Sequence, residues 1–327
     1  MRTSFKSSGD LIVDRRFEYG QVFFREGDYA AAIDLFEQAI DRAPAWPSAH
    51  FSLGKARREI GDRVGAASAF RECLRLDPDD VLGASLALAE IDDAATVSAA
   101  PPAYVKALFD AYAEDFDKAL VERLDYSTPQ KLAAAIRAVR GDTGRSGRAL
   151  DLGCGTGLAG AAIVADVAFL EGVDISDGMI EAARMKGVYD KLEIADILAA
   201  LHRRAETYDL ILAADVLIYF GDLSGVFASM SARLGEGGLA AFSVEKGADA
   251  DWSIQPSLRF AHSADYVARA VKSVGLDLIS IEETVLRKDR GADVAGLLVI
   301  ARKPKRAPSG LPSVGEASFI DAPASVY

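Results

Sequence analysis

Residues 148–157 read RALDLGCGTG, an apolar run that ends at an aspartate and passes into three glycines at alternate positions. The pattern predicts a buried strand over Ala149–Leu152, a tight turn, and a helix that begins near Leu158. Because glycine has no Cβ, the backbone of such a turn can come close to a ligand. A turn between a strand end and a helix N-terminus is where open α/β folds bind nucleotides.

A second apolar run, Phe169–Val173, ends in Asp174, which lies 23 residues after Asp151. An acid at the tip of the second strand of such a fold accepts hydrogen bonds from both hydroxyls of a ribose. The glycine spacing is G-x-G-x-G, whereas dinucleotide-binding folds use G-x-G-x-x-G. Asp151, directly before the glycines, would repel a pyrophosphate but suits a ligand with a cationic amino acid end.

This pattern resembles motif I of the class I S-adenosylmethionine-dependent methyltransferases. The resemblance implies S-adenosylmethionine as the cofactor. The cofactor-binding residues that it implies are Asp151, Gly153 and Gly155 for the methionine end, Asp174 for the ribose, Ile175 and Met179 as apolar walls of the adenine, and Asp196 with Ile197 at the adenine amino group. For Met179, a place in the ordinary core of its helix is an equally good explanation.

The N-terminal part of the chain repeats itself with a period of 34 residues. Gly20, Gly27, Ala32, Phe36, Ala39 and Pro44 recur as Gly54, Gly61, Ala66, Phe70, Cys73 and Pro78. This period and residue set are typical of tetratricopeptide repeats, so we predict an all-α repeat domain over 13–92, with two repeats and a capping helix. Since three repeats are usually needed for stability, this domain should lean on the rest of the chain or on a second copy. Its role is a docking groove for a protein partner, self-association, or support of the fold.

The remainder alternates strands with helices, which predicts a parallel sheet with right-handed crossovers. The strands are expected within 192–196, 208–220 and 238–245, the helices over 176–187 and 263–275, and an antiparallel pair closes the sheet. The fold class is therefore α/β, a Rossmann-like class I methyltransferase sheet with a terminal hairpin. We expect a linker over 93–103, the methyltransferase domain over 104–303 and a disordered tail over 304–327.

Three residues are candidates for the acceptor side of the site. Asp215 and Tyr219 follow the fourth strand, and His262 precedes a helix, with Arg259 and Tyr266 nearby. We expect His262 to be a general base at the rim, with Arg259 binding an anionic group of the acceptor; the alternative is a helix-boundary residue.

The segment 103–140 reads as helical and carries a further cofactor candidate. Tyr112 lies in the string YAEDFD, which resembles a segment that folds over the cofactor in many small-molecule methyltransferases. We therefore expect Tyr112 to act as a lid residue over the cofactor. The alternative for this side chain is plain core, because the aromatic residues around it recur at helical spacing.

Composition excludes several classes of function. The chain has 327 residues and a net charge of −12, which disfavours a nucleic acid partner. No stretch approaches the roughly 20 apolar residues of a membrane span, and residues 1–16 lack the apolar core of a secretory signal. Two cysteines supply neither a disulfide framework nor a metal site. We expect a cytoplasmic protein with no metal.

Together these patterns predict transfer of a methyl group to an oxygen or nitrogen of a small molecule by in-line displacement. The order of repeats and motifs is similar to that of bacterial predicted methyltransferases that carry tetratricopeptide repeats. Two alternatives remain open: a protein methyltransferase whose repeats recruit the target, and a non-catalytic scaffold that binds the cofactor.

Overall fold

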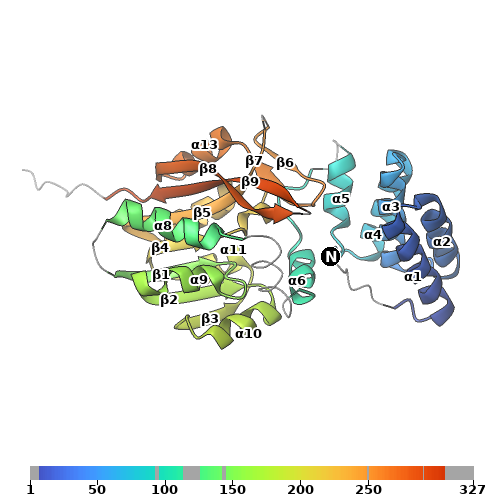
Figure 1. The fold of residues 1–327 in the computed structure, drawn as a ribbon, viewed down its shortest axis with the longest axis horizontal. Coiled ribbons are helices and arrows are strands. Elements are labelled where there is room, and N and C mark those ends of the chain that lie inside the picture. Colours follow the sequence, from blue (N-terminus) through green and yellow to red (C-terminus); the bar gives the residue numbers. More distant parts are fainter. Residues whose placement is uncertain are drawn as a thin grey trace, which may run out of the picture.

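The structure is a computed structural model, and it describes residues 7–92, 96–112, 126–141, 145–248, 250–289 and 291–305. A helical part is followed along the chain by an α/β part, and the two lie side by side (Figure 1). The predicted tail beyond Lys305 lies outside the described residues.

The helical part consists of two antiparallel helix pairs and one further helix. Its elements are α1 (Leu11–Glu26), α2 (Tyr29–Arg42), α3 (Pro47–Glu59), α4 (Arg63–Leu76) and α5 (Ala84–Ile91). The second helix of each pair begins at an aspartate N-cap, Asp28 for α2 and Asp62 for α4, whose side chain accepts a backbone N–H of the first turn. The same cap therefore recurs at the 34-residue period.

Within each pair, a phenylalanine packs on a glycine of the partner helix. Phe36 and Phe70 are fully buried. A Cβ at Gly20 would lie 2.6 Å from the Phe36 ring, and one at Gly54 would lie 2.6 Å from the Phe70 ring. The glycines therefore let the paired helices approach, and the phenylalanine rings fill the gap between them.

In the α/β part, nine strands of the described residues form one sheet. Five are parallel in the order β3-β2-β1-β4-β5, namely β1 (Ser146–Leu152), β2 (Val167–Asp174), β3 (Lys191–Ile194), β4 (Tyr208–Ala213) and β5 (Leu234–Lys246). The hairpin of β8 (Asp277–Asp289) and β9 (Ala292–Arg302) then adds antiparallel strands beside β5. The predicted Rossmann-like sheet with a terminal hairpin is confirmed.

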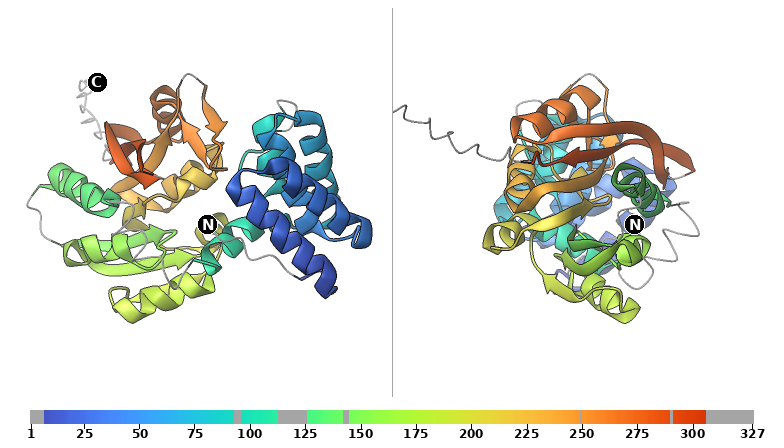
Figure 2. Two further views of the ribbon diagram at one scale, coloured as in Figure 1. Left: turned by 45° about the vertical axis from the view of Figure 1, so that its right-hand side comes forward. Right: turned by 90° about the vertical axis from the view of Figure 1, so that its left-hand side faces the viewer.

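Helices cover both faces of this sheet. One hydrophobic cluster joins the sheet to α8 (Thr128–Arg140) and α9 (Leu158–Ile163). The cluster on the other face includes α11 (Ile197–Arg203), α12 (Ser224–Arg233) and α13 (Ala264–Ser273). Figure 2 shows this layering from two further directions. A parallel sheet covered on both faces presents its strand ends as the place for a ligand.

Two local features differ from the expected strands. The strand expected within 208–220 ends at Ala213, and the chain then turns through Asp215 into the short 3-10 helix η4 (Leu217–Tyr219). In addition, β7 (Phe260–His262) pairs with the end of β5, and β6 (Trp252–Ile254) pairs with β7. Strands of three residues are too short to show an alternating pattern in the sequence.

The repeat domain packs against the α/β part, as its small size led us to expect. Leu86 of α5 shares a hydrophobic cluster with Ile218, Tyr219 and Phe260. The predicted linker contributes to the same contact, because the N–H of Ala100 donates to the Tyr219 carbonyl at 2.8 Å. Residues 98–100, just before α6 (Pro102–Asp110), thus lie along the α/β part.

Candidate functional site

The glycine turn leaves β1 at the carboxyl edge of the sheet. Gly153 has φ +63°, and a Cβ built there would lie 2.3 Å from Cγ2 of Val216, which follows β4. The N–H of Cys154 donates to the Val173 carbonyl at 2.9 Å. Because Gly153 has no side chain, the glycine turn packs directly on the loop after β4, where we expected the methyl acceptor.

Asp174 lies at the tip of β2, next to this turn, and is 7% exposed. Its Oδ2 accepts the N–H of Gly155 and its Oδ1 accepts the N–H of Ser176, both at 2.9 Å. Burial raises the pKa of this carboxyl above its ordinary value, against the lowering effect of the backbone donors. Each carboxylate oxygen has a second lone pair, so both can still accept a hydroxyl.

Asp151 was expected to contact the methionine end of the cofactor, but its side chain does not face the open side of the turn. Its side chain is fully buried, and the hydroxyl of Tyr189 donates to Oδ2 at 2.7 Å. Burial raises the pKa of the Asp151 carboxyl to about 7. The carboxyl is thus enclosed beneath the turn, next to Tyr189 and the backbone of Gly160.

The residues expected around an adenine divide into two groups. Asp196 caps α11 through a hydrogen bond of 3.0 Å from the Ala199 N–H, and it remains half-exposed beside Ile197. Ile175 is also half-buried. Met179 is fully buried inside α10 (Asp177–Lys186), which agrees with the helix-core interpretation and not with an exposed adenine wall.

Helix α6 lies across the start of α10. The Ser176 hydroxyl donates to Oδ1 of Asp110 at 2.6 Å, and Lys106 forms ion pairs with Asp110 and Asp177. Tyr112 follows α6 and is half-buried, with its N–H bonded to the Phe109 carbonyl at 3.0 Å. The segment expected to continue as the lid, 113–125, lies outside the described residues.

Of the three acceptor-side candidates, Asp215 is the one that remains partly exposed at the carboxyl edge of the sheet. It has φ +54°, an uncommon conformation for a residue with a side chain, and its side chain is 13% exposed. Its N–H donates to Oγ of Ser243 at 2.8 Å, and the Ser243 hydroxyl donates back to Oδ1 at 3.1 Å. The side chain of Ser243, in β5, therefore holds both the backbone and the carboxylate of Asp215.

Arg287 connects Asp215 to a second acid. Nη1 of this guanidinium lies 2.7 Å from Oδ2 of Asp215, and Nη2 contacts Glu245, with Arg287 itself 4% exposed. Burial by itself lowers the pKa of the guanidinium, but the two carboxylates more than offset this and raise it above its ordinary value. The cluster thus keeps a permanent cation between two acids from β4 and β5.

His262 is not at the rim, where the sequence led us to expect it. Its side chain is 0% exposed, because β7 inserts between β6 and the end of β5. Nε2 bonds the Gly221 carbonyl at 3.0 Å, which requires a hydrogen on Nε2. Burial lowers the pKa of this imidazole to about 4. Enclosed in this way, His262 has no access to a methyl acceptor.

Tyr219 also differs from the expected cleft-edge position. It is 5% exposed and packs edge-on against Phe109, with 5.7 Å between ring centroids. Its phenol bonds Arg259, and burial raises the pKa of that phenol. Arg259 also lies 3.4 Å from Asp289, so the guanidinium expected to bind an anion is already paired.

Three residues of this site escaped the sequence analysis. Glu245 ends a buried strand in the same way as Asp174 and carries the same signal. Arg287 and Tyr189 have no local signal, because each acts on a residue brought close only by folding.

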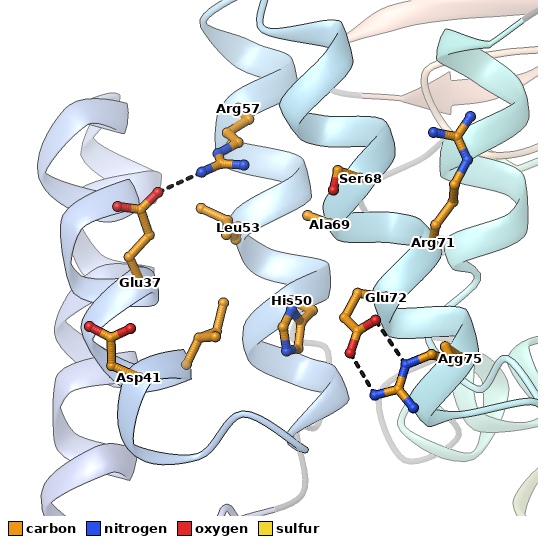
Figure 3. A pocket seen from close by; sticks show the side chains of 11 residues that line it. Glu37, Asp41, His50, Leu53, Arg57, Ser68, Ala69, Arg71, Glu72 and Arg75 are labelled. Atoms are coloured by element: carbon orange, nitrogen blue, oxygen red, sulfur yellow. Dashed lines mark hydrogen bonds and ion pairs between the residues drawn. The ribbon is translucent and has the colours of Figure 1, made fainter.

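A cavity of about 700 Å³ lies elsewhere, among α2, α3 and α4 of the repeat domain. Its charged side chains are largely paired, Glu37 with Arg57 and Glu72 with Arg75 (Figure 3). None of the cofactor candidates lines it. The cavity is therefore a feature of the repeats and not of the glycine turn.

Two searches of the described residues bear on other classes of site. Among the helices of these residues, none is long and apolar enough to span a bilayer. The same part of the chain contains no group of three or more histidine, cysteine or acidic side chains placed to hold a metal ion.

Known proteins resemble each part of the chain. A family model described as methyltransferase domain matches residues 150–240, and one described as tetratricopeptide repeat matches residues 17–81. A search of the curated proteins finds no match.

Among solved structures, magnesium protoporphyrin IX methyltransferase from Synechocystis with bound S-adenosylmethionine is 18% identical over 53% of this chain and 79% of its own, with a TM-score of 0.41. An S-adenosylmethionine-dependent methyltransferase from Clostridium acetobutylicum is 16% identical over 60% and 99%, with a TM-score of 0.45. One from Mesorhizobium loti is 25% identical over 52% and 96%, with a TM-score of 0.41.

Each matched family range falls within one part of the structure. The range 150–240 contains the glycine turn, Asp174, Asp196 and Asp215, and the range 17–81 begins within α1 and contains α2, α3 and α4. The chain thus carries a methyltransferase domain, matched over residues 150–240, after tetratricopeptide repeats, matched over residues 17–81.

Proposed function

We propose that this protein transfers the methyl group of S-adenosylmethionine to an oxygen or nitrogen of a small molecule. The proposal depends mainly on the presence of two acids, Asp174 and Asp215, at the carboxyl edge of one sheet. Asp174 faces the cofactor turn from β2, and Asp215 faces the acceptor side after β4. The packing of Gly153 on Val216 brings these two sides together.

The described residues fit this cofactor. The backbone N–H groups of Gly155 and Ser176 each bond one oxygen of Asp174, and the remaining acceptor capacity of the carboxylate is available to the ribose hydroxyls. Asp196 has its Oδ1 occupied by the helix cap, which leaves the other oxygen for the adenine amino group, between Ile197 and Ile175. Gly153 and Gly155 offer backbone to the methionine end, and Tyr112 lies near the same edge as the lid candidate.

The sulfonium of the cofactor supplies an already activated methyl group, so the protein must position the acceptor and remove its proton. We assign both tasks to Asp215. Its carboxylate is held by Arg287 and Ser243 and remains partly exposed. It accepts a hydrogen bond from the hydroxyl or amino group of the acceptor and takes the proton that this group loses. His262 and Tyr219 are enclosed and support this wall.

A small acceptor is favoured by the way in which the repeat domain docks. Leu86 of α5 packs on Tyr219, and Tyr104 of α6 lies over Gly83. These contacts cover the side of the edge next to η4, which a folded protein substrate would need to approach. A protein target recruited by the repeats is the second candidate, and the cavity among α2, α3 and α4 supports it.

Two experiments test the proposal. Calorimetry on the full chain should show binding of S-adenosylmethionine and S-adenosylhomocysteine but no comparable binding of NAD. Methyl-labelled cofactor is then incubated with a cell extract, and the label is followed into small-molecule and protein fractions. Label in small molecules supports the proposal, and label in proteins supports the second candidate. Cofactor binding with no transferred label in either fraction would identify a scaffold.

The matched variant for the transfer step is Asp215→Asn, which keeps the size of the side chain and removes its charge. It should bind S-adenosylhomocysteine as the unmodified chain does and lose roughly 100-fold or more of the label transfer. Unchanged transfer would exclude Asp215 as the group that takes the proton.

A further inference from the structure

Tyr189 occupies a fixed position between α10 and β3, beneath the glycine turn. The next residue, Asp190, holds this segment to β2 through two hydrogen bonds with Leu170. Its N–H donates to the Leu170 carbonyl at 2.9 Å, and its Oδ2 accepts the Leu170 N–H at 2.7 Å. Because the backbone is anchored in this way, the Tyr189 ring has little freedom to move.

The Tyr189 ring fills space that three glycines leave. A Cβ at Gly160 would lie 2.4 Å from the Tyr189 hydroxyl oxygen, and its three nearest atoms all belong to Tyr189. A Cβ at Gly157 would lie 3.0 Å from the ring, and one at Gly172 would lie 2.9 Å from it. The third glycine of the sequence motif, Gly157, is therefore required by a tyrosine 32 residues later as well as by the turn.

The hydroxyl of Tyr189 supplies the hydrogen bond that Asp151 has on Oδ2, at 2.7 Å. The other oxygen, Oδ1, is buried and has no hydrogen-bond partner among the described residues. Without the Tyr189 hydroxyl, only the backbone of Gly160 would remain to stabilise the buried carboxylate, which would then be disfavoured. Tyr189 thus keeps Asp151 in place at the point where β1 passes into the turn.

A second side chain from the end of α10 acts on the same turn. Nζ of Lys186 donates to the carbonyl of Thr156 at 2.7 Å and lies 3.0 Å from its hydroxyl oxygen. The turn is therefore held from two points, Asp151 before the glycines and Thr156 within them, both by residues near the end of α10.

We propose that Tyr189 is a positioning residue that sets the glycine turn for S-adenosylmethionine binding through its hydrogen bond to Asp151. The inference rests on the proposed function, because it concerns the same cofactor. Tyr189 acts from beneath the turn, through Asp151.

The test measures binding of S-adenosylhomocysteine to the full chain by calorimetry, as a function of pH. Tyr189→Phe removes the hydroxyl and keeps the ring, and Tyr189→Ala removes both. The matched control is Tyr208→Phe, because Tyr208 is a buried tyrosine of the same domain whose hydroxyl bonds Arg204 at 3.0 Å, away from the turn. Thermal unfolding and the fitted stoichiometry report whether each variant is folded.

At pH 7 we expect Tyr189→Phe to weaken binding roughly 5- to 30-fold with unchanged stoichiometry, and Tyr208→Phe to bind as the unmodified chain does. The charged or titratable side chains that face Asp151 are Tyr189, Cys154, Asp174 and Tyr126. If Asp151 holds the turn, the affinity should change with pH in a step where the Asp151 carboxyl titrates. Since the Tyr189 hydroxyl favours the ionised carboxylate, its loss should also move this step to higher pH. A packing role alone would not move this step.

The outcomes separate the two claims. If the unmodified chain does not bind S-adenosylhomocysteine, the proposed function fails and the inference fails with it. If the unmodified chain binds and Tyr189→Phe binds equally well with the same pH step, only the positioning role is overturned. Equal weakening in Tyr189→Phe and Tyr208→Phe would also overturn it, because the effect would then belong to the domain and not to the turn.

Discussion

The guanidinium of Arg287 lies 2.7 Å from the carboxylate of Asp215, and this ion pair connects the terminal hairpin to the turn after β4. Asp215 adopts φ +54°, a backbone conformation that costs on the order of 1 kcal/mol or more for a residue with a side chain. Such a conformation persists only when its surroundings hold it. Here Arg287 holds the carboxylate and Ser243 holds both the N–H and the carboxylate.

Replacing Arg287 should destabilise the fold. Arg287→Met leaves the carboxylates of Asp215 and Glu245 without their shared cation, and breaking a buried pair in this way costs about 3–5 kcal/mol. Denaturant unfolding should show this loss, and Arg287→Met combined with Glu245→Gln should recover part of it. A single variant as stable as the unmodified chain would show that the ion pairs contribute nothing.

Asp174 should dominate the affinity for the cofactor. Asp174→Ala removes the acceptor of the ribose hydroxyls, which should cost on the order of 2–3 kcal/mol, or roughly 30- to 150-fold in affinity for S-adenosylhomocysteine. Asp177→Ala is the control, because Asp177 lies three residues after Asp174 but is exposed and pairs with Lys106. Unchanged calorimetric affinity in Asp174→Ala would remove the motif assignment.

Asp151 should make the fold less stable as the pH rises. Its folded pKa, about 7, lies above the ordinary value of 3.8, so its contribution is complete below about pH 4 and is lost as the pH rises through 7. The loss is on the order of 4 kcal/mol. Asp151→Asn should flatten this part of the curve of unfolding free energy against pH. A slope that persists in the variant would assign it to another group.

His262 should have the opposite effect. Its folded pKa, about 4, lies below the ordinary value of 6.5, so its contribution is complete above pH 6.5 and is lost as the pH falls towards 4, on the order of 3 kcal/mol. In His262→Gln an amide can still donate to the Gly221 carbonyl, and the slope between pH 6.5 and 4 should shrink. His202→Gln, at an exposed position, is the control in the same denaturation series.

Gly160 and Tyr189 should be coupled. Gly160→Ala should destabilise the protein by about 1–3 kcal/mol, because the added Cβ displaces an anchored ring. In a Tyr189→Ala background the same change meets no ring and should become stabilising by up to about 1 kcal/mol, since alanine favours the helix. Gly225→Ala in α12, where no atom lies within 4 Å of the new Cβ, serves as the control. Additive effects in the double variant would contradict the coupling.

The sequence was most informative where a function or a packing contact is written in one local string. The glycine turn and Asp174 at the end of β2 lie where they were expected, and Asp196 lies two residues after β3, which ends at Ile194. The repeat period indicated that Gly20 and Phe36 have equivalents in Gly54 and Phe70, and the structure shows the same contact in both pairs. In each case the relevant residues belong to one strand end, one helix end or one helix pair, and helix and strand periodicity alone brings them together.

The acceptor side was predicted less well, because its geometry depends on which strands become neighbours. His262 looked like a rim residue from its place before α13, but pairing of β7 with β5 and β6 encloses it. Tyr219 looked exposed at a strand end, but α5 and α6 cover it. Tyr112 stays a prediction, since the rest of its segment lies outside the described residues.

The sequence by itself thus determined the repeated helix pairs, the alternation of strands and helices, and the acid at the tip of β2, since local patterns specify secondary structure and turns. Only the tertiary structure decided which charged groups meet. Arg287 reaches Asp215 across 72 residues and Tyr189 reaches Asp151 across 38. Contacts of that separation follow from strand order and from the packing of helix ends, because hydrogen bonds and ion pairs form only between atoms within a few ångströms.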